Sequence, residues 1–212
     1  TPAPYRVLNF DSFRTDAAKK ARDGAVADAM VPILAHKLDA LHPIADGIRA
    51  VLQEDFPTIW GALSDAGTQR EVTLVWREDG TMCRCRFDAL PPASHGFTCD
   101  LKFTGLSAEP QEWSKKVATD YLFQSSLYPR AVKALRGDMP EFKFIVCETA
   151  PPYGISIHAA APGLEDKGAA RVDTALAIWR HCMATGTWPR YSTLTHYTEA
   201  PPWFEKRDEE RA

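Results

Sequence analysis

The chain has 212 residues, of which 45% are hydrophobic and 25% are charged, and its formal net charge is −3 at pH 7. This composition is typical of a globular protein with one well-packed domain, and it excludes collagen-like and low-complexity chains. No apolar stretch approaches the roughly 20 residues that a membrane-spanning helix needs. Because the net charge is negative, an anionic partner must be held by a local basic patch or through a metal.

The cysteines and the first residues indicate the cellular compartment. Five cysteines, an odd number, favour reduced thiols in a cytosolic protein over a secreted disulfide framework. No basic-then-apolar leader with a small-residue cleavage site opens the sequence. Residue 1 is Thr instead of Met, so we expect a fragment or a processed chain located in the cytoplasm.

The N-terminal third is expected to be helical. Residues 11–30 are rich in alanine and charge, and Asp11 is suited to cap the start of a helix. Residues 33–53 carry apolar side chains at helical spacing, and Pro43 is expected to divide them into two helices. We therefore predict an N-terminal helical extension over residues 1–66.

The pattern then changes to the alternation that is typical of β-strands. Residues 70–77 and 81–88 alternate on either side of Asp79-Gly80, a dipeptide that favours a hairpin turn. A third alternating strand is expected at residues 96–103, after a loop that contains two prolines.

Two long helices and two further strands complete the predicted order. They are expected at about 110–136, 141–149, 153–159 and 163–185. Helices, three strands, a helix, two strands and a helix predict an α/β (or α+β) fold, in which helices flank a mixed β-sheet. We expect this core over residues 67–204, followed by a charged tail over 205–212.

Polar side chains of two neighbouring strands can converge. The two-residue period places Asp88 on the same strand face as Arg84 and Arg86, opposite the apolar face, and it places Asp100 and Lys102 together. If the strands pair, two carboxylates and an ammonium meet in one pocket, which suits Mg²⁺ and the activation of a water molecule. The alternative is an exposed strand face with a local ion pair.

The order of these segments resembles a known nuclease core. CRCRFDAL, then CDLKFTG, then a long helix, resembles the PD-(D/E)XK superfamily, and more narrowly the C-terminal nuclease domain of exonuclease VIII (RecE-like). Residues 124–128 (QSSLY) resemble its Q-x-x-x-Y motif, and residues 148–153 (ETAPPY) resemble a turn between its last strands. The tail TGTWPRYSTLTHYTEAPPWF resembles its end, so the resemblance covers roughly residues 70–204.

The resemblance implies roles for the polar residues on the two strands. Asp88 and Asp100, with the carbonyl of Leu101, would bind Mg²⁺, for which Mn²⁺ substitutes. Lys102 would be the catalytic lysine that positions or deprotonates the attacking water.

One ligand of this nuclease branch has no counterpart in the sequence. Its members use a His in a G-x-x-x-H setting on an N-terminal helix, and their spacing places it at or before residue 1. His36 and His42 lie too close to the strands, and we interpret them as surface or packing residues. Glu71 opens the first strand and is either a further acid near the pocket or an exposed strand residue.

Gln124 and Tyr128 are one helical turn apart and therefore share a helix face. The resemblance implies that both are site residues and that this face points toward the active site and the DNA strand. The alternative is that the pair simply covers the sheet. We expect Phe123, Leu127 and Ala131 to face the sheet.

Basic and aromatic residues are candidates for contacts with DNA. Lys115 and Lys116, together with Arg86, are suited to the phosphate backbone, and Trp113 and Tyr121 to stacking on bases. The alternative is a solvated helix face above an aromatic core stripe.

These observations predict a Mg²⁺-dependent deoxyribonuclease, an enzyme that acts on linear double-stranded DNA ends in phage or bacterial recombination. The resemblance supplies the 5′–3′ exonuclease polarity, and it allows a ring-shaped homo-oligomer and a single-strand annealing protein as partner. Two alternatives stay open: a catalytically impaired module that binds DNA or a recombination partner, and a restriction-type endonuclease. No second cysteine pair at zinc-ligand spacing and no Gly-rich phosphate loop accompany this pattern.

Overall fold

The structure is a computed structural model in which residues 4–199 are described. Contacts divide the chain into two units, Thr1–Leu176 and Ala177–Ala212, and the division falls within the last helix, α6 (Pro162–Thr185). The predicted charged tail and the last residues of the predicted core lie outside the described residues. No helix in the described part of the chain is both long and apolar enough to cross a bilayer.

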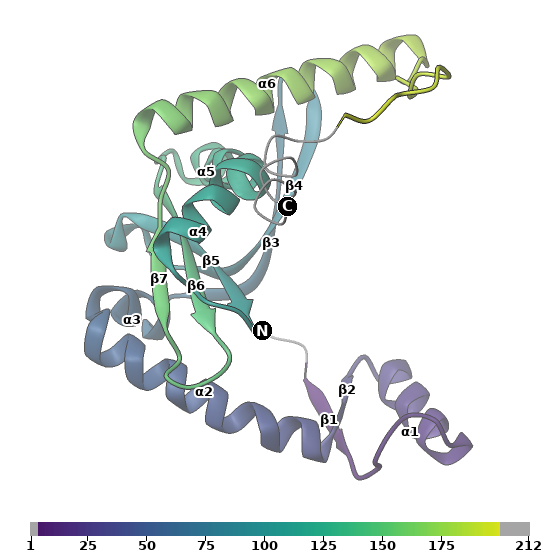
Figure 1. Ribbon diagram of the computed structural model, residues 1–212, viewed down its shortest axis with the longest axis vertical. Helices are drawn as coiled ribbons and strands as arrows, with labels where there is room; N and C mark the ends of the chain where they lie inside the picture. Colours follow the sequence, from purple (N-terminus) through teal and green to yellow (C-terminus); the bar gives the residue numbers. More distant parts are fainter. Residues whose placement is uncertain (1–3, 200–212) are drawn as a thin grey trace, which may run out of the picture. The chain divides into compact units, whose positions relative to one another are not determined.

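The larger unit is built on a five-stranded sheet with the order β3-β4-β5-β6-β7 (Figure 1). The strands are β3 (Gln69–Glu78), β4 (Thr81–Leu90), β5 (Phe97–Thr104), β6 (Glu141–Glu148) and β7 (Ile155–His158). β5 and β6 are parallel, and the other neighbouring pairs are antiparallel. The predicted mixed sheet with flanking helices is confirmed.

The first two strands of this sheet form the predicted hairpin. Asp79 and Gly80 have φ values of 45° and 84°, the positive values that a tight two-residue hairpin turn needs. The pairing runs without a change of register from Glu78–Thr81 at the turn to Gln69–Leu90 at the far end.

Each face of the sheet is covered by its own helices. They are α4 (Pro110–Lys116), a π-helical segment (Val117–Tyr121) and α5 (Leu122–Arg136) on one face, and α2 (Ala35–Asp55) and α3 (Pro57–Ser64) on the other. Under α4 and α5 lies an aromatic core with Phe87, Phe142 and Phe144 at its centre. Under α2 and α3 lies a second core that includes Phe97 and Ile145. Helices therefore cover both faces around the centre of the sheet, whereas alternate residues of β3 and β4 stay exposed.

The N-terminal part differs from its prediction. Two short strands, β1 (Tyr5–Leu8) and β2 (Val31–Leu34), pair in parallel, and the helix α1 (Asp16–Ala27) lies between them in the sequence. Four-residue strands, one of which contains a proline, are too short to give a readable alternation. Asp11 does not cap the helix, because the hydroxyl of Thr15 accepts the hydrogen bond from the Ala18 amide at 3.3 Å.

The prediction that Pro43 divides this region into two helices is wrong, because α2 continues through Pro43 as a single helix. Proline removes one backbone donor from the helix and leaves a carbonyl without its usual partner. Pro43 is exposed, so water can satisfy that carbonyl and the helix need not end there.

Gly47 lets α2 approach the turn between β6 and β7. A Cβ atom at this position would lie 2.2 Å from the ring of Tyr153, whereas a Cβ atom at Gly24 of α1 would meet nothing within 4 Å. Gly47→Ala should therefore lower the free energy of unfolding by about 1–3 kcal/mol through overpacking. Gly24→Ala, the matched control, should raise it by about 0.5–1 kcal/mol, since alanine is the better helix former.

Urea unfolding followed by circular dichroism measures both changes. If Gly47→Ala proved as stabilising as Gly24→Ala, the contact between α2 and the Tyr153 ring would be wrong.

Candidate active site

The candidate site is the gap where β4 and β5 diverge. Within residues 4–199 these strands share a single bridge, between Ala89 and Cys99. Continuing this antiparallel register by one residue places Asp88 opposite Asp100. The two carboxylates therefore approach each other from neighbouring strands at the first position where the strands separate.

The alternation of β4 breaks at Asp88, beside this gap. Phe87 belongs to the core under α5 and Ala89 to the core under α2, although residues two apart in a regular strand share a face. The alternation that predicted Asp88 on the face of Arg84 and Arg86 therefore does not continue beyond Asp88.

The backbone of β5 holds the Asp88 carboxylate, since Oδ2 accepts a hydrogen bond from the Leu101 amide at 3.0 Å. The N–H and C=O of one strand residue point to the same edge, so the carbonyl of Leu101 also faces the gap. Burial raises the pKa of Asp88, and the negative charge of Asp100 raises it further. The gap thus concentrates negative charge in a partly buried place.

Asp100, Lys102 and Gln124 form a closed polar triad. The Lys102 Nζ lies 2.6 Å from Oδ2 of Asp100 and 3.2 Å from Oε1 of Gln124, and the Gln124 amide donates to Oδ1 of Asp100 at 2.7 Å. Asp100 is only 5% exposed. Its Oδ2 receives no well-aligned hydrogen bond within the described residues, so the Lys102 ammonium is its charge partner.

Aromatic rings fix the lysine from a second direction. The Lys102 Nζ lies 4.7 Å from the centre of the Tyr121 ring, a cation–π distance, and Tyr121 stacks on Trp113 at 6.0 Å. The sequence did not predict the contact of Tyr121 with Lys102, because a π-helical segment shifts the helical phase without a local sequence signal.

Gln124 and Tyr128 both lie on the sheet-facing side of α5. Gln124 joins the polar triad, whereas Tyr128 packs on Phe87 with 5.0 Å between ring centres, and its hydroxyl interacts with the Arg86 backbone. Burial raises the pKa of Tyr128. The expectation that Phe123 faces the sheet is wrong, since it is 41% exposed, whereas Leu127 and Ala131 do pack against the core.

Of the residues predicted to touch DNA, Trp113 is excluded from stacking on bases. It is 4% exposed, it stacks on Tyr121, and its indole N–H donates to the Ser107 carbonyl at 3.1 Å. Lys115 is exposed and paired with Glu112 at 2.8 Å, and Lys116 is half-buried. The contacts of these two lysines with DNA stay predictions.

Glu71 lies beside the site, at the level of Asp88 in the β3–β4 hairpin. Its neighbours Arg70 and Val72 pair with Ala89 and Phe87, and Glu71 itself has a φ of 54°, a left-handed conformation that strains a non-glycine residue. Its carboxylate pairs with the guanidinium of Arg86. The strain coincides with the break in the alternation of β4.

A groove of about 1080 Å³ opens on the gap from the α2 side of the sheet. Apolar side chains of α2 and α3 line most of it, and the lining also includes Glu71, Asp88 and Leu101. His36 and His42 are exposed on α2, as predicted. Across residues 4–199, no group of three His, Cys, Asp or Glu side chains is arranged to hold a metal ion.

The cysteines near the site are buried free thiols. Burial raises the pKa of Cys85 to about 11 and that of Cys99 to about 12. Both thiols therefore stay protonated at neutral pH, and protonated thiols are poor metal ligands and nucleophiles.

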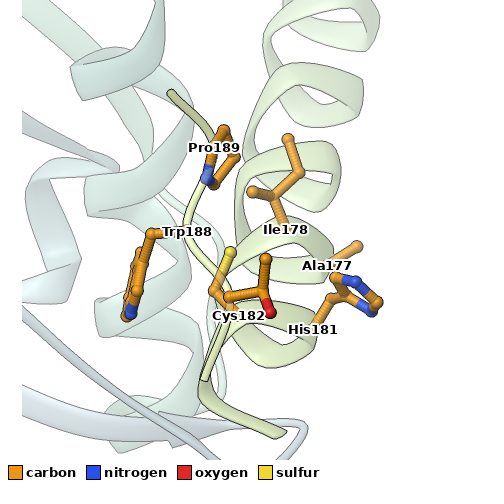
Figure 2. Close-up of a pocket in the computed structure, with 7 residues that line it drawn as sticks. Ala177, Ile178, His181, Cys182, Trp188 and Pro189 are labelled. Atoms are coloured by element: carbon orange, nitrogen blue, oxygen red, sulfur yellow. The ribbon is translucent and has the colours of Figure 1, made fainter. Parts of the chain in front are cut away.

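The smaller unit contains a cavity of its own, which Figure 2 shows in close-up. Its volume is about 440 Å³, and its walls are mostly apolar, with Pro189 beside Ile178 of α6. Among the described residues, His181 and Cys182 are the titratable ones that line it, and none of its lining residues in that part of the chain is a carboxylate. This cavity therefore lacks the convergent charges of the gap between β4 and β5.

Comparisons with known proteins bear on the fold. Residues 30–201 match the model of a family described as a PDDEXK-like domain of unknown function (DUF3799). A crystal structure from Eubacterium rectale, named "Putative exonuclease", is similar with a TM-score of 0.53 and 15% sequence identity, over 88% of this chain and 70% of that one. At this identity the likeness concerns the fold. No curated protein gives a match.

The electrostatics of the gap predict that Asp88→Asn raises the melting temperature slightly at pH 7 without divalent cations. Since the pKa of Asp88 is raised on folding, its ionised form weakens the folded state, and stability falls as the pH rises from the unfolded pKa through the folded one. The gain should vanish below about pH 4, where the carboxyl is protonated in both states.

Thermal unfolding in EDTA between acidic and neutral pH tests this prediction. Asn can still accept the bond from Leu101, so the substitution removes mainly the charge. Asp39→Asn, an exposed change on α2, is the matched control and should leave the melting temperature unchanged. A lower melting temperature for Asp88→Asn at pH 7 would contradict the proposed repulsion.

Proposed function

The chain belongs to the family of PDDEXK-like domains whose model matches residues 30–201, and we propose that it is a metal-dependent deoxyribonuclease. One observation carries the proposal: Asp88 and Asp100 are opposed where two strands diverge, and Lys102 is bonded to Asp100. Membership of the family confirms the superfamily resemblance. The narrower likeness to exonuclease VIII belongs to the proposal.

The residues at the gap fit a divalent cation with oxygen ligands. Carboxylate and carbonyl oxygens suit Mg²⁺ and Mn²⁺, and we propose Asp88, Asp100 and the Leu101 carbonyl as ligands. A bound cation would offset the repulsion that raises the pKa of Asp88. When bound, such a cation polarises a phosphate and lowers the pKa of a water molecule.

Lys102 is the proposed catalytic lysine. Asp100, Gln124 and the Tyr121 ring hold its ammonium in one place, so that it can donate a hydrogen bond to a phosphate oxygen or orient the attacking water. Gln124 positions this lysine together with Asp100. Tyr128, one helical turn further along α5, is proposed to line the path of the DNA strand.

The finer proposal is a 5′–3′ exonuclease that acts on linear double-stranded ends in phage or bacterial recombination, in the cytoplasm and with Mg²⁺. The resemblance to exonuclease VIII and the name of the Eubacterium rectale protein support it. Arg86, Lys115 and Lys116 are proposed to contact the DNA backbone. A homo-oligomer and a single-strand annealing partner belong to the same proposal.

A second candidate is a nuclease-like module that binds DNA without cutting it. The observation that favours it is that only two carboxylates converge at the gap, with no metal-binding group of three side chains in the described part of the chain. A restriction-type endonuclease would share the same residues. Degradation of linear but not circular duplex DNA would separate an exonuclease from both alternatives.

The proposed role of Lys102 predicts that Lys102→Ala slows metal-dependent degradation of linear duplex DNA by about 100-fold or more while the protein stays folded. The variant leaves both carboxylates in place and removes the group that orients the water. Lys19→Ala on α1 is the matched control and should cut DNA at the wild-type rate. If the full-length Lys102→Ala protein degraded DNA as fast as the wild type, the active site would lie elsewhere.

The proposed ligands make a separate prediction that needs no activity. Mg²⁺ or Mn²⁺ should raise the free energy of unfolding of the wild type by about 2.7 kcal/mol at a hundredfold excess over the Kd. This gain is measured as a rise in the melting temperature. Asp100→Asn should lose most of this gain, because one anionic ligand is missing. Equal stabilisation of Asp100→Asn and the wild type would place the cation elsewhere.

A further inference from the structure

A polar hollow of about 370 Å³ lies beside the gap. Its walls are formed by Thr73 of β3, by Arg84, Cys85 and Arg86 of β4, and by Tyr128 of α5. Two guanidinium groups and two hydroxyls offer hydrogen-bond donors, and no carboxylate among residues 4–199 lines the hollow. This set of groups suits an anion with several oxygen atoms.

Two elements of the fold lead from the gap to the hollow. Along β4, Arg86 and Arg84 follow Asp88 at steps of two residues, each about 7 Å of strand. Along α5, Tyr128 stands one turn after Gln124, a member of the polar triad. The hydroxyl of Tyr128 interacts with the Arg86 backbone, which joins the two routes.

The two arginines differ in their partners. Arg86 pairs with Glu71, so its guanidinium is partly neutralised and held near Asp88. Arg84 is exposed, and its guanidinium forms no hydrogen bond or ion pair with residues 4–199, although its backbone pairs with Val75 of β3. A guanidinium presents several donors in a plane and binds phosphate through two of them at once. Arg84 is therefore the group in the hollow that is available for an anion.

We propose that the hollow binds a phosphodiester of the same DNA strand that is cut at the gap, one or two nucleotides away from the cut. In this arrangement the strand runs along β4, with Asp88 beside the phosphodiester that is cleaved and Arg84 on the flanking one. Arg84 is then a substrate-binding residue that fixes the position of the strand. The inference rests on the proposed nuclease function and adds the path of its substrate.

Fluorescence anisotropy of a labelled DNA duplex with a single-stranded overhang tests the hollow without cleavage, in EDTA. Arg84→Gln should weaken binding about five- to tenfold and lower the slope of log K against log salt by about one. Arg84→Lys should keep the slope but restore only part of the affinity, because ammonium does not bind in a bidentate manner. Arg14→Gln, an exposed arginine outside the hollow, should change neither quantity.

The outcomes separate this inference from the nuclease proposal. Binding that depends on Arg84, in a protein that does not degrade DNA, would support a phosphate site in the hollow but overturn the nuclease, and with it the position of this site beside a cut. If the wild type degrades DNA and Arg84→Gln binds DNA as tightly as Arg14→Gln does, the proposed phosphate site in the hollow would be overturned and the nuclease proposal would stand. Absence of DNA binding by the wild type would also overturn this phosphate site, as would Arg84-dependent binding of inorganic phosphate with unchanged affinity for DNA.

Discussion

The opposition of two carboxylates across diverging strands is the constraint on which the rest of the site depends. Like charges in a partly buried place destabilise the fold unless nearby groups balance them. Asp88 has the Leu101 amide, and Asp100 has Lys102 and Gln124. Leu101 and Lys102 belong to β5 and Gln124 belongs to α5, so these two elements together supply the groups that hold the two acids.

The two cores serve this arrangement in different ways. The aromatic core under α4 and α5 ends at the Tyr121 ring, which carries the Lys102 ammonium on its face, so apolar packing and the charged site are continuous. The core under α2 and α3 stops short of the gap and leaves a groove that opens on Asp88. Asp100 is thus buried against the helices α4 and α5, and Asp88 is accessible from the groove on the other side of the sheet.

Sequence reasoning predicted the sheet, the hairpin turn and the meeting of Asp88, Asp100 and Lys102, because strand alternation and turn chemistry are local signals. It failed where the outcome depends on tertiary contacts. Pro43 continues a helix because it faces water, and Trp113 is buried because Tyr121 covers it. The break in the alternation of β4 lies opposite the strained Glu71, and no residue pattern in the sequence predicts it.

The single bridge between β4 and β5 also bears on how the molecule opens. β5 is the central strand of the sheet and pairs with β6 along its whole length, whereas the β3–β4 hairpin is joined to it by one bridge only in the described part of the chain. Local opening should therefore release the hairpin at a lower free energy than the strand that carries Asp100 and Lys102. We therefore expect the backbone amides of β5 to exchange their hydrogens more slowly than those of β4, although both strands contribute to the same site.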